Sequence, residues 1–147
     1  MLYKPMKNIF IIAILLFAFS CKKTAVTTEP AKIITANFWK LDRYTDANGK
    51  ALNVNELNSQ ALGIFDLEFE FIADNRVRGR DTKSKQILNA GTWYLVDNDK
   101  AINIDIIGFA GNFKVVSLAK TKMILQAENN KLISAASTVN LELVPVL

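Results

Sequence analysis

The sequence of 147 residues contains no histidine and a single cysteine, Cys21. Without histidine, the chain cannot form a Ser-His or Cys-His catalytic dyad or a His metal ligand. One cysteine also excludes a disulfide framework and a thiolate zinc cluster. We therefore expect no enzymatic activity, no metal and no cofactor. The length is that of one domain.

The chain also has only a small net charge. Lys and Arg together number 18, and Asp and Glu number 14, which gives a formal net charge of +4. Lys4 and Lys7 belong to the N-terminal leader described next, so the rest of the chain is nearer to neutral. This balance does not favour contact with a polyanion, and we expect no nucleic acid partner.

The first twenty residues have the pattern of a signal peptide. Lys4 and Lys7 precede an unbroken apolar segment over residues 9–19. A helix of that length covers roughly 16 Å, about half of the hydrocarbon core of a bilayer. The segment is too short to span a membrane, and its length is typical of a signal peptide. We therefore expect residues 1–20 to be removed.

The residues around Cys21 resemble a bacterial lipobox, because a small residue, Ser20, comes directly before a cysteine at the end of the apolar segment. The resemblance implies that Cys21 is the lipid-attachment residue of a lipoprotein, with a diacylglycerol on its sulfur and a third acyl chain on its amine. Ala18 and Ser20 also fit ordinary signal peptidase, which would leave a soluble secreted protein with a free Cys21. An unpaired thiol has no other evident use in an oxidising compartment, which favours the anchor.

Residues 21–34 are predicted to be the lipidated cysteine and a flexible tether. Thr24 to Lys32 contains Thr, Ala, Val, Glu and Pro without apolar periodicity. Lys22 and Lys23 follow the cysteine, and no acidic cluster does. In the lipoproteins that the barrel motifs described below resemble, surface-exported members tend to carry acidic residues at these positions. By that comparison we expect an outer-membrane lipoprotein of the cell envelope that faces the periplasm.

Residues 35–147 alternate apolar and polar side chains with a period of two, which is typical of strands. Turn residues separate the strands about every ten positions, and such spacing predicts a sandwich or a barrel. Consecutive hairpins favour an all-β, antiparallel, up-and-down eight-stranded barrel, since closure removes exposed edges. One short helix is expected over Leu52–Leu62. The predicted strands cover residues 38–44, 65–71, 76–80, 88–96, 102–106, 113–118, 123–127 and 139–143.

The order of motifs resembles the lipocalin-like lipoproteins of Bacteroidota. Trp39 lies in the first strand, FEFIADNRVRG forms a hairpin from Phe69, and AGTWYLVDNDKAINI places Trp93 in a strand before an Asp-rich turn. The resemblance implies a calycin-type barrel over most of the chain after the leader. The chain differs from true lipocalins because no Gly stands two residues before Trp39 and no Arg follows Arg80.

The aromatic residues allow two interpretations. They either line a cavity for a small apolar ligand or fill the core, since small eight-stranded barrels do both. The number of large side chains favours a filled core. The wider aromatic set also contains Phe65 and Tyr94, and the candidate cavity or core residues are Trp39, Phe69, Phe71, Trp93 and Phe113.

Arg76, Arg78 and Arg80 lie on one face of a predicted strand and form a candidate surface contact. They either bind an anion or a partner protein, or they pair across the hairpin with Glu68 and Glu70. The complementary charges favour the second interpretation.

Two further segments do not match known ligand-binding loops. Asp97 and Asp99 lie in a turn that lacks the spacing of a calcium loop, and Asp is common in turns for conformational reasons. Gly108–Gly111 does not match a phosphate-binding loop, and we expect a flexible hairpin or barrel-rim loop there.

The sequence thus predicts a membrane-anchored envelope lipoprotein with a lipocalin-like barrel that binds a small apolar ligand. The alternative is a non-enzymatic module for protein–protein interaction, or a structural accessory of the outer membrane with an envelope protein as partner. An apolar pocket of several hundred Å³ would favour the ligand. A solid interior with an exposed surface patch would favour the interaction module.

Overall fold

The regular alternation of inward and outward side chains produces strands from Phe38 onward. In the computed structural model, which describes residues 28–131 and 133–147, these strands are antiparallel. Burial alternates most clearly in β7 and in β5 from Ile102 onward, where every second side chain is buried. The strands are β1 (Phe38–Thr45), β2 (Leu67–Phe71), β3 (Arg76–Asp81), β4 (Ile87–Val96), β5 (Ala101–Ile106), β6 (Phe109–Ala119), β7 (Lys122–Glu128) and β8 (Thr138–Pro145).

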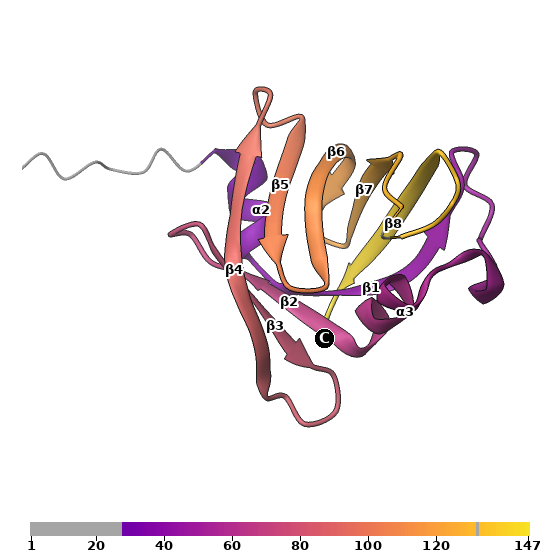
Figure 1. Cartoon of the computed structure of the whole chain (residues 1–147). Helices are drawn as coiled ribbons and strands as arrows, with labels where there is room; N and C mark the ends of the chain where they lie inside the picture. Colours follow the sequence, from indigo (N-terminus) through magenta and orange to yellow (C-terminus); the bar gives the residue numbers. More distant parts are fainter. Residues whose placement is uncertain (1–27, 132) are drawn as a thin grey trace, which may run out of the picture.

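The sheet closes on itself (Figure 1). Each strand pairs with the next along the chain, and β8 returns to pair with β1, for example through Leu41 and Leu143. Both of these side chains are buried in the core. The prediction of an all-β, antiparallel, up-and-down barrel of eight strands is therefore confirmed.

The helical segment between β1 and β2 is present, with shifted bounds. It consists of η2 (Val54–Glu56), α3 (Ser59–Gly63) and η3 (Ile64–Asp66), where η marks a 3-10 turn. The Asn58 side chain caps α3 by accepting a hydrogen bond from the Ala61 N–H at 3.0 Å. Phe65 therefore lies in a 3-10 turn and is partly exposed, so its placement in the second strand was wrong.

The predicted tether is a helix in its second half. Helix α2 covers Glu29–Thr35, with the Thr28 side chain as N-cap and a proline in its first turn. Its Ile34 is fully buried, and the Ile34 carbonyl accepts a hydrogen bond from Trp39 Nε1 at 2.8 Å. The folded domain thus begins before the predicted boundary at residue 35. Cys21 and the predicted signal peptide lie outside the described residues.

The expected loop at Gly108–Gly111 is mostly strand. Ile107 and Gly108 alone form the turn between β5 and β6, and Gly108 adopts the left-handed φ of 83° that favours glycine there. Strand β6 begins at Phe109, which pairs with Ile106. The glycine-rich composition marked a tight turn whose flanking residues continue the sheet.

The connections define two ends of the barrel. We call the end with α2 the closed end, because α2 contacts both β2 and β6, which lie on opposite walls. The β1–β2, β3–β4, β5–β6 and β7–β8 connections all lie at the other end, which we call the mouth. Segment α3 belongs to this end (Figure 1).

We expect Trp93→Ala to lower the free energy of unfolding by roughly 3–5 kcal/mol, as for other large core side chains. The ring is buried, its Nε1 donates to the Ile72 carbonyl at 3.0 Å, and it meets Phe71 edge-on at 5.6 Å. Urea denaturation measures the effect, with Tyr94→Ala on the exposed face of the same strand as the control. A loss no larger than that of the control would contradict a core role for Trp93.

Candidate functional site

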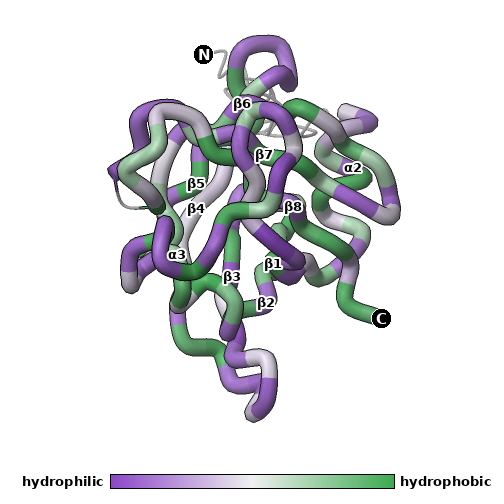
Figure 2. The backbone as a smooth tube through the Cα atoms, turned by 90° about the vertical axis from the view of Figure 1, so that its right-hand side faces the viewer, coloured by the Kyte–Doolittle hydropathy of each residue, from purple (hydrophilic) through white to green (hydrophobic). Residues whose placement is uncertain are grey.

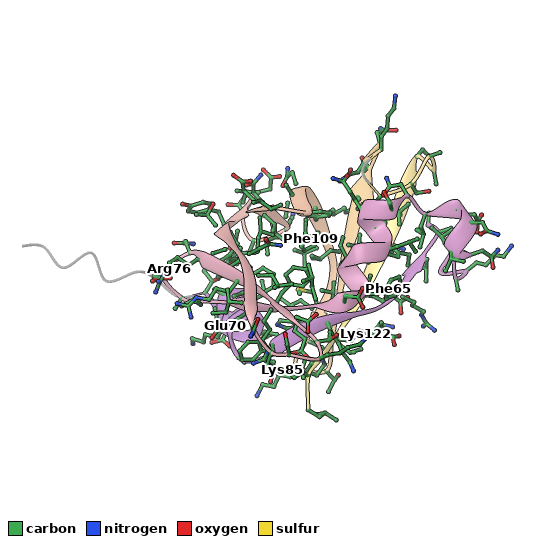
Figure 3. The ribbon with its side chains drawn as sticks, turned by 60° about the horizontal axis from the view of Figure 1, so that its bottom comes forward. Phe65, Glu70, Arg76, Lys85, Phe109 and Lys122 are labelled. Atoms are coloured by element: carbon green, nitrogen blue, oxygen red, sulfur yellow. The ribbon has the colours of Figure 1, made fainter. Side chains whose placement is uncertain are left out.

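Aromatic rings fill the lumen of the barrel. Phe69 on β2 and Phe109 on β6 have ring centroids 4.9 Å apart, and Phe109 lies 5.0 Å from Phe113. Strands β2 and β6 are four positions apart in a ring of eight, so the Phe69–Phe109 contact reaches from one wall to the other. Figure 3 places Phe109 inside the barrel. This contact occupies the space that a ligand would need.

The predicted cavity or core residues are all buried. Trp39, Phe69, Phe71, Trp93 and Phe113 belong to one hydrophobic cluster. Both indole N–H groups are satisfied by backbone carbonyls, that of Trp39 by Ile34 and that of Trp93 by Ile72. The structure brings these five side chains together as core.

Two segments cover the mouth, and hydrogen bonds join them to each other. Leu57 forms a β-bridge with Ser134, and the Asn58 N–H donates to the Ile133 carbonyl at 3.1 Å. The Tyr44 hydroxyl, from the wall below, donates to the Ala61 carbonyl at 3.0 Å. Burial raises the pKa of Tyr44, so its hydroxyl stays protonated and remains a donor. Segment α3 and the β7–β8 connection therefore act as a joined cover.

A small pocket lies beneath this cover. Its volume is about 50 Å³, which is far below the roughly 300–1,000 Å³ of typical ligand sites. It is lined by apolar side chains and by two amide side chains, and it has room for a few water molecules. The lining residues are Gln60, Ile64, Gly108, Phe109, Ala110, Phe113, Asn130 and Ile133.

Large apolar side chains are exposed around the mouth. They come from the β1–β2 connection, the start of β4 and the β5–β6 turn. Exposed apolar side chains at one end of a fold make that end a candidate contact surface. We call this set the mouth rim, and it consists of Val54, Leu62, Phe65, Ile87, Leu88 and Ile107.

The arginine strand pairs with its neighbours, as the sequence favoured. Arg80 Nε lies 2.6 Å from Glu68, and Arg78 lies 3.6 Å from Glu70 across the β2–β3 pair. Arg76 pairs instead with Asp74 in the preceding turn, at 2.6 Å. The three cations therefore form no free anion site. Figure 3 places Arg76, Glu70 and Lys85 toward the outside of the barrel.

Glu68 is almost fully buried although it faces outward. Arg80 and Lys85 each donate to its carboxylate at 2.6 Å, and the Arg80 guanidinium stacks on Phe38 at 3.6 Å from the ring centroid. Burial raises the pKa of Glu68, but these hydrogen bonds outweigh burial and hold the pKa below its ordinary value. The long cationic side chains thus shield the carboxylate from water.

Glu142 on β8 has the same arrangement at the seam that closes the barrel. Arg43 of β1 lies 2.9 Å from its carboxylate, and Lys122 of β7 lies 2.6 Å from it. Burial again raises the pKa of Glu142, and the two hydrogen bonds outweigh that effect and lower it. One buried carboxylate therefore links three adjacent strands.

The carboxylates of the β4–β5 turn have a conformational role. Asp97, Asn98 and Asp99 all have left-handed φ angles of 53° to 66°, which Asp and Asn tolerate better than most residues. In the described part of the chain, no cluster of three Asp, Glu, Cys or His side chains could hold a metal ion.

Sequence reasoning missed Phe109, Tyr44 and Ile64. Phe109 was hidden between two glycines, where a loop was expected. The sequence did contain a signal for the helix that covers the closed end, since Thr28 followed by Glu29 and Pro30 is a favourable start for a helix.

Comparison with known proteins finds no family model that matches the chain and no curated protein similar to it. Within residues 28–131 and 133–147, no helix is both long and apolar enough to cross a bilayer.

As the pH falls, we expect Glu142 and Glu68 to lose their contribution to stability. Their pKa values are lower in the folded chain, so the ion pairs contribute fully above the ordinary Glu value of 4.5 and less as the pH falls through the lowered values. Denaturant titrations at neutral and acidic pH measure the effect. Glu142→Gln is expected to lower stability at neutral pH and to flatten the pH dependence. Glu70→Gln, on the exposed Arg78 pair, is the matched control, and equal pH profiles for both variants would contradict the assignment.

The two hairpin arginines are expected to differ. Arg78→Ala should cost under about 1 kcal/mol, because its pair with Glu70 is partly exposed. Arg80→Ala should cost roughly 1–3 kcal/mol, because it leaves the buried Glu68 with fewer hydrogen bonds and uncovers Phe38. Urea denaturation of both variants under the same conditions makes the comparison. Equal losses would contradict the role given to Arg80.

Proposed function

We propose that the chain is a non-enzymatic interaction module of the cell envelope, held to the membrane through Cys21. The lipocalin-like barrel serves as a solid scaffold, and the mouth rim is the surface that meets an envelope protein partner.

The contact of Phe69 with Phe109 is the observation that carries this proposal. Because it crosses the lumen from β2 to β6, it leaves the barrel interior to side chains. The pocket under the cover holds only about 50 Å³. Recognition is then a task for the outer surface, where the mouth rim exposes aliphatic and aromatic side chains.

The placement of the first described residues supports an anchored module. Thr28 and α2 lie at the closed end, whereas the mouth rim lies at the opposite end. A chain attached through Cys21 would leave the rim free to meet a partner. The lipobox-like residues and the order of the barrel motifs support an outer-membrane lipoprotein of the lipocalin-like type, facing the periplasm.

A second candidate function is the binding of a small apolar ligand under the cover. The observation that favours it is the composition of the pocket, where Ile64, Phe109, Phe113 and Ile133 surround two amides. A ligand larger than a few water molecules would have to displace α3 from the mouth.

Native mass spectrometry of the protein purified from its own envelope tests both candidates. We expect the mass of three acyl chains on Cys21 and a protein partner that copurifies, with no small molecule that dissociates. A bare Cys21 would contradict the anchor. A stoichiometric apolar molecule in the solvent extract would favour the ligand-binding candidate instead.

A double variant in the mouth rim and a control variant outside it test whether the rim binds the partner. Val54→Lys with Leu62→Lys places charge on the α3 side of the mouth rim and is expected to release the partner. Val116→Lys changes a similarly exposed residue on β6, outside the rim, and is expected to retain it. Retention by both variants would contradict the role of the rim.

A further inference from the structure

The polar side chains on the outer face of β5 and β6 are not tied to one another, in contrast to those of β2 and β8. On β2 and β8, Glu68 and Glu142 are each held between two cations. In the part of the chain that the structure describes, the exposed side chains of Asn103, Asn112 and Lys114 take part in no hydrogen bond or ion pair. Their donors and acceptors are therefore available to a ligand.

An exposed aromatic ring lies in the same row of side chains. Tyr94 of β4 pairs with Asn103 of β5, which pairs in turn with Asn112 of β6. The Tyr94 side chain is 47% exposed, and within the described residues it contacts no other aromatic ring. Neighbouring strands lie about 4.8 Å apart, so the row extends over roughly 10 Å from the ring to the second amide.

A groove lies next to this row, on the outer face of β5, β6 and β7. Its volume of about 420 Å³ falls within the roughly 300–1,000 Å³ of typical ligand sites. Ala101 lies in the groove, where it pairs with Lys114, and its small side chain leaves space above the sheet. Asn112 lines the groove and also belongs to the row of Tyr94, so the two form one continuous surface. Figure 1 shows β4, β5 and β6 side by side.

One amide of the groove is held in place from behind. Gln126 Nε2 donates to Asn140 Oδ1 at 2.9 Å, and Asn140 Nδ2 donates to the Asp46 carbonyl at 3.0 Å. The Gln126 carbonyl oxygen accepts no hydrogen bond within the described residues. This oxygen is thus oriented before a ligand arrives, which lowers the entropy lost on binding.

The charges of the groove cancel. Lys100 and Lys114 supply two cations, and Asp97 and Glu128 supply two carboxylates. The balance favours a ligand without net charge. The mixture of donors and acceptors favours a ligand whose groups do both, and hydroxyl groups have this property. In Figure 2, the hydrophilic residues of β6 and β7 interrupt hydrophobic ones, as in strands with one polar face.

We propose that the outer wall of the barrel binds a neutral oligosaccharide at a site formed by Tyr94, Asn103, Asn112, Lys114 and Gln126, which we call the wall site. The aromatic ring packs against the apolar C–H face of one sugar, and the two asparagines hydrogen-bond its hydroxyl groups. The groove receives the next sugar. An aromatic surface with a few convergent polar groups is a common composition of ligand sites. The proposal goes beyond the proposed function, because the wall site lies outside the mouth rim.

Nuclear magnetic resonance titration of the full chain with cellotriose, maltotriose and triacetylchitotriose tests the proposal. The chain is kept in a detergent without a sugar headgroup, since such a headgroup would compete. We expect at least one of these sugars to bind and to shift the backbone amide signals of Tyr94, Asn103 and Asn112. No shift with any of them at millimolar concentration would overturn the proposal, as would shifts confined to the mouth rim.

Variants of Tyr94 separate the role of the ring from that of the fold. Tyr94→Ala is expected to raise the dissociation constant about fivefold to tenfold. Tyr94→Phe keeps the ring and is expected to retain most of the affinity. Leu88→Ala removes a similarly exposed side chain of β4 outside the wall site and is expected to bind like the wild type. Circular dichroism confirms that each variant is folded. Equal affinities of Tyr94→Ala and Leu88→Ala would contradict the role of the ring.

Two further probes distinguish other classes of ligand. Trigalacturonate is an acidic oligosaccharide, and triglycine is a peptide with one charge of each sign. We expect both to bind more weakly than the best neutral sugar, because the groove has no net charge. Tighter binding of triglycine would overturn the proposal in favour of a peptide site. Tighter binding of trigalacturonate would contradict the assignment of a neutral ligand.

Discussion

In a closed barrel of eight strands, the width of the lumen is set by the strand number and stagger, and it is just wide enough for side chains to fill. The contact between Phe69 and Phe109 spans the lumen, because it joins strands on opposite walls of the barrel. Phe113 extends the same stack along β6 toward the closed end, which α2 and Ile34 cover. A smaller side chain in place of Phe109 would leave a cavity; the large ring makes the barrel a solid body. The assignment of recognition to the outer surface depends on this one packing constraint.

The outer surface shows how such a small body keeps its sheet closed without disulfides in the described part of the chain. Glu68 and Glu142 are buried on the outside, each between two cationic side chains. Burial of a carboxylate is costly, and removing one partner from a buried pair costs more than an exposed pair is worth. These two sites therefore favour the correct neighbours in the sheet, β2 with β3 and β7 with β8 and β1. Their hydrogen bonds add to the apolar core instead of competing with it, since they lie on the opposite face of the strands.

The barrel could be predicted from the sequence, because the alternation of apolar and polar residues and the turn residues are local signals. Phe69 and Phe71 against Glu68 and Glu70, or Ile102 and Ile104 against Asn103, are recognisable within a few residues. The ring contact across the lumen was beyond sequence reasoning, because it depends on the stagger of the closed sheet. Phe109 was missed for a local reason, since the glycines around it indicate a loop while only Gly108 has the φ of a turn. The burial of Glu68 was also not predictable, because it needs the Phe38 ring and the Lys85 side chain, which come from other strands and turns.

The two ends of the barrel are held to the core by different contacts. At the closed end, the Trp39 indole binds the carbonyl of Ile34, so the helix that receives the N-terminal segment is tied to the core. At the mouth, the cover is joined to the wall by polar contacts such as Tyr44 to Ala61, and its apolar residues remain exposed. Helix α2 at one end and the cover at the other are thus held by side chains of the same hydrophobic cluster. In the proposed function, the anchor at the closed end and the partner at the mouth rim would therefore be separated by a lumen that the Phe69–Phe109 contact fills.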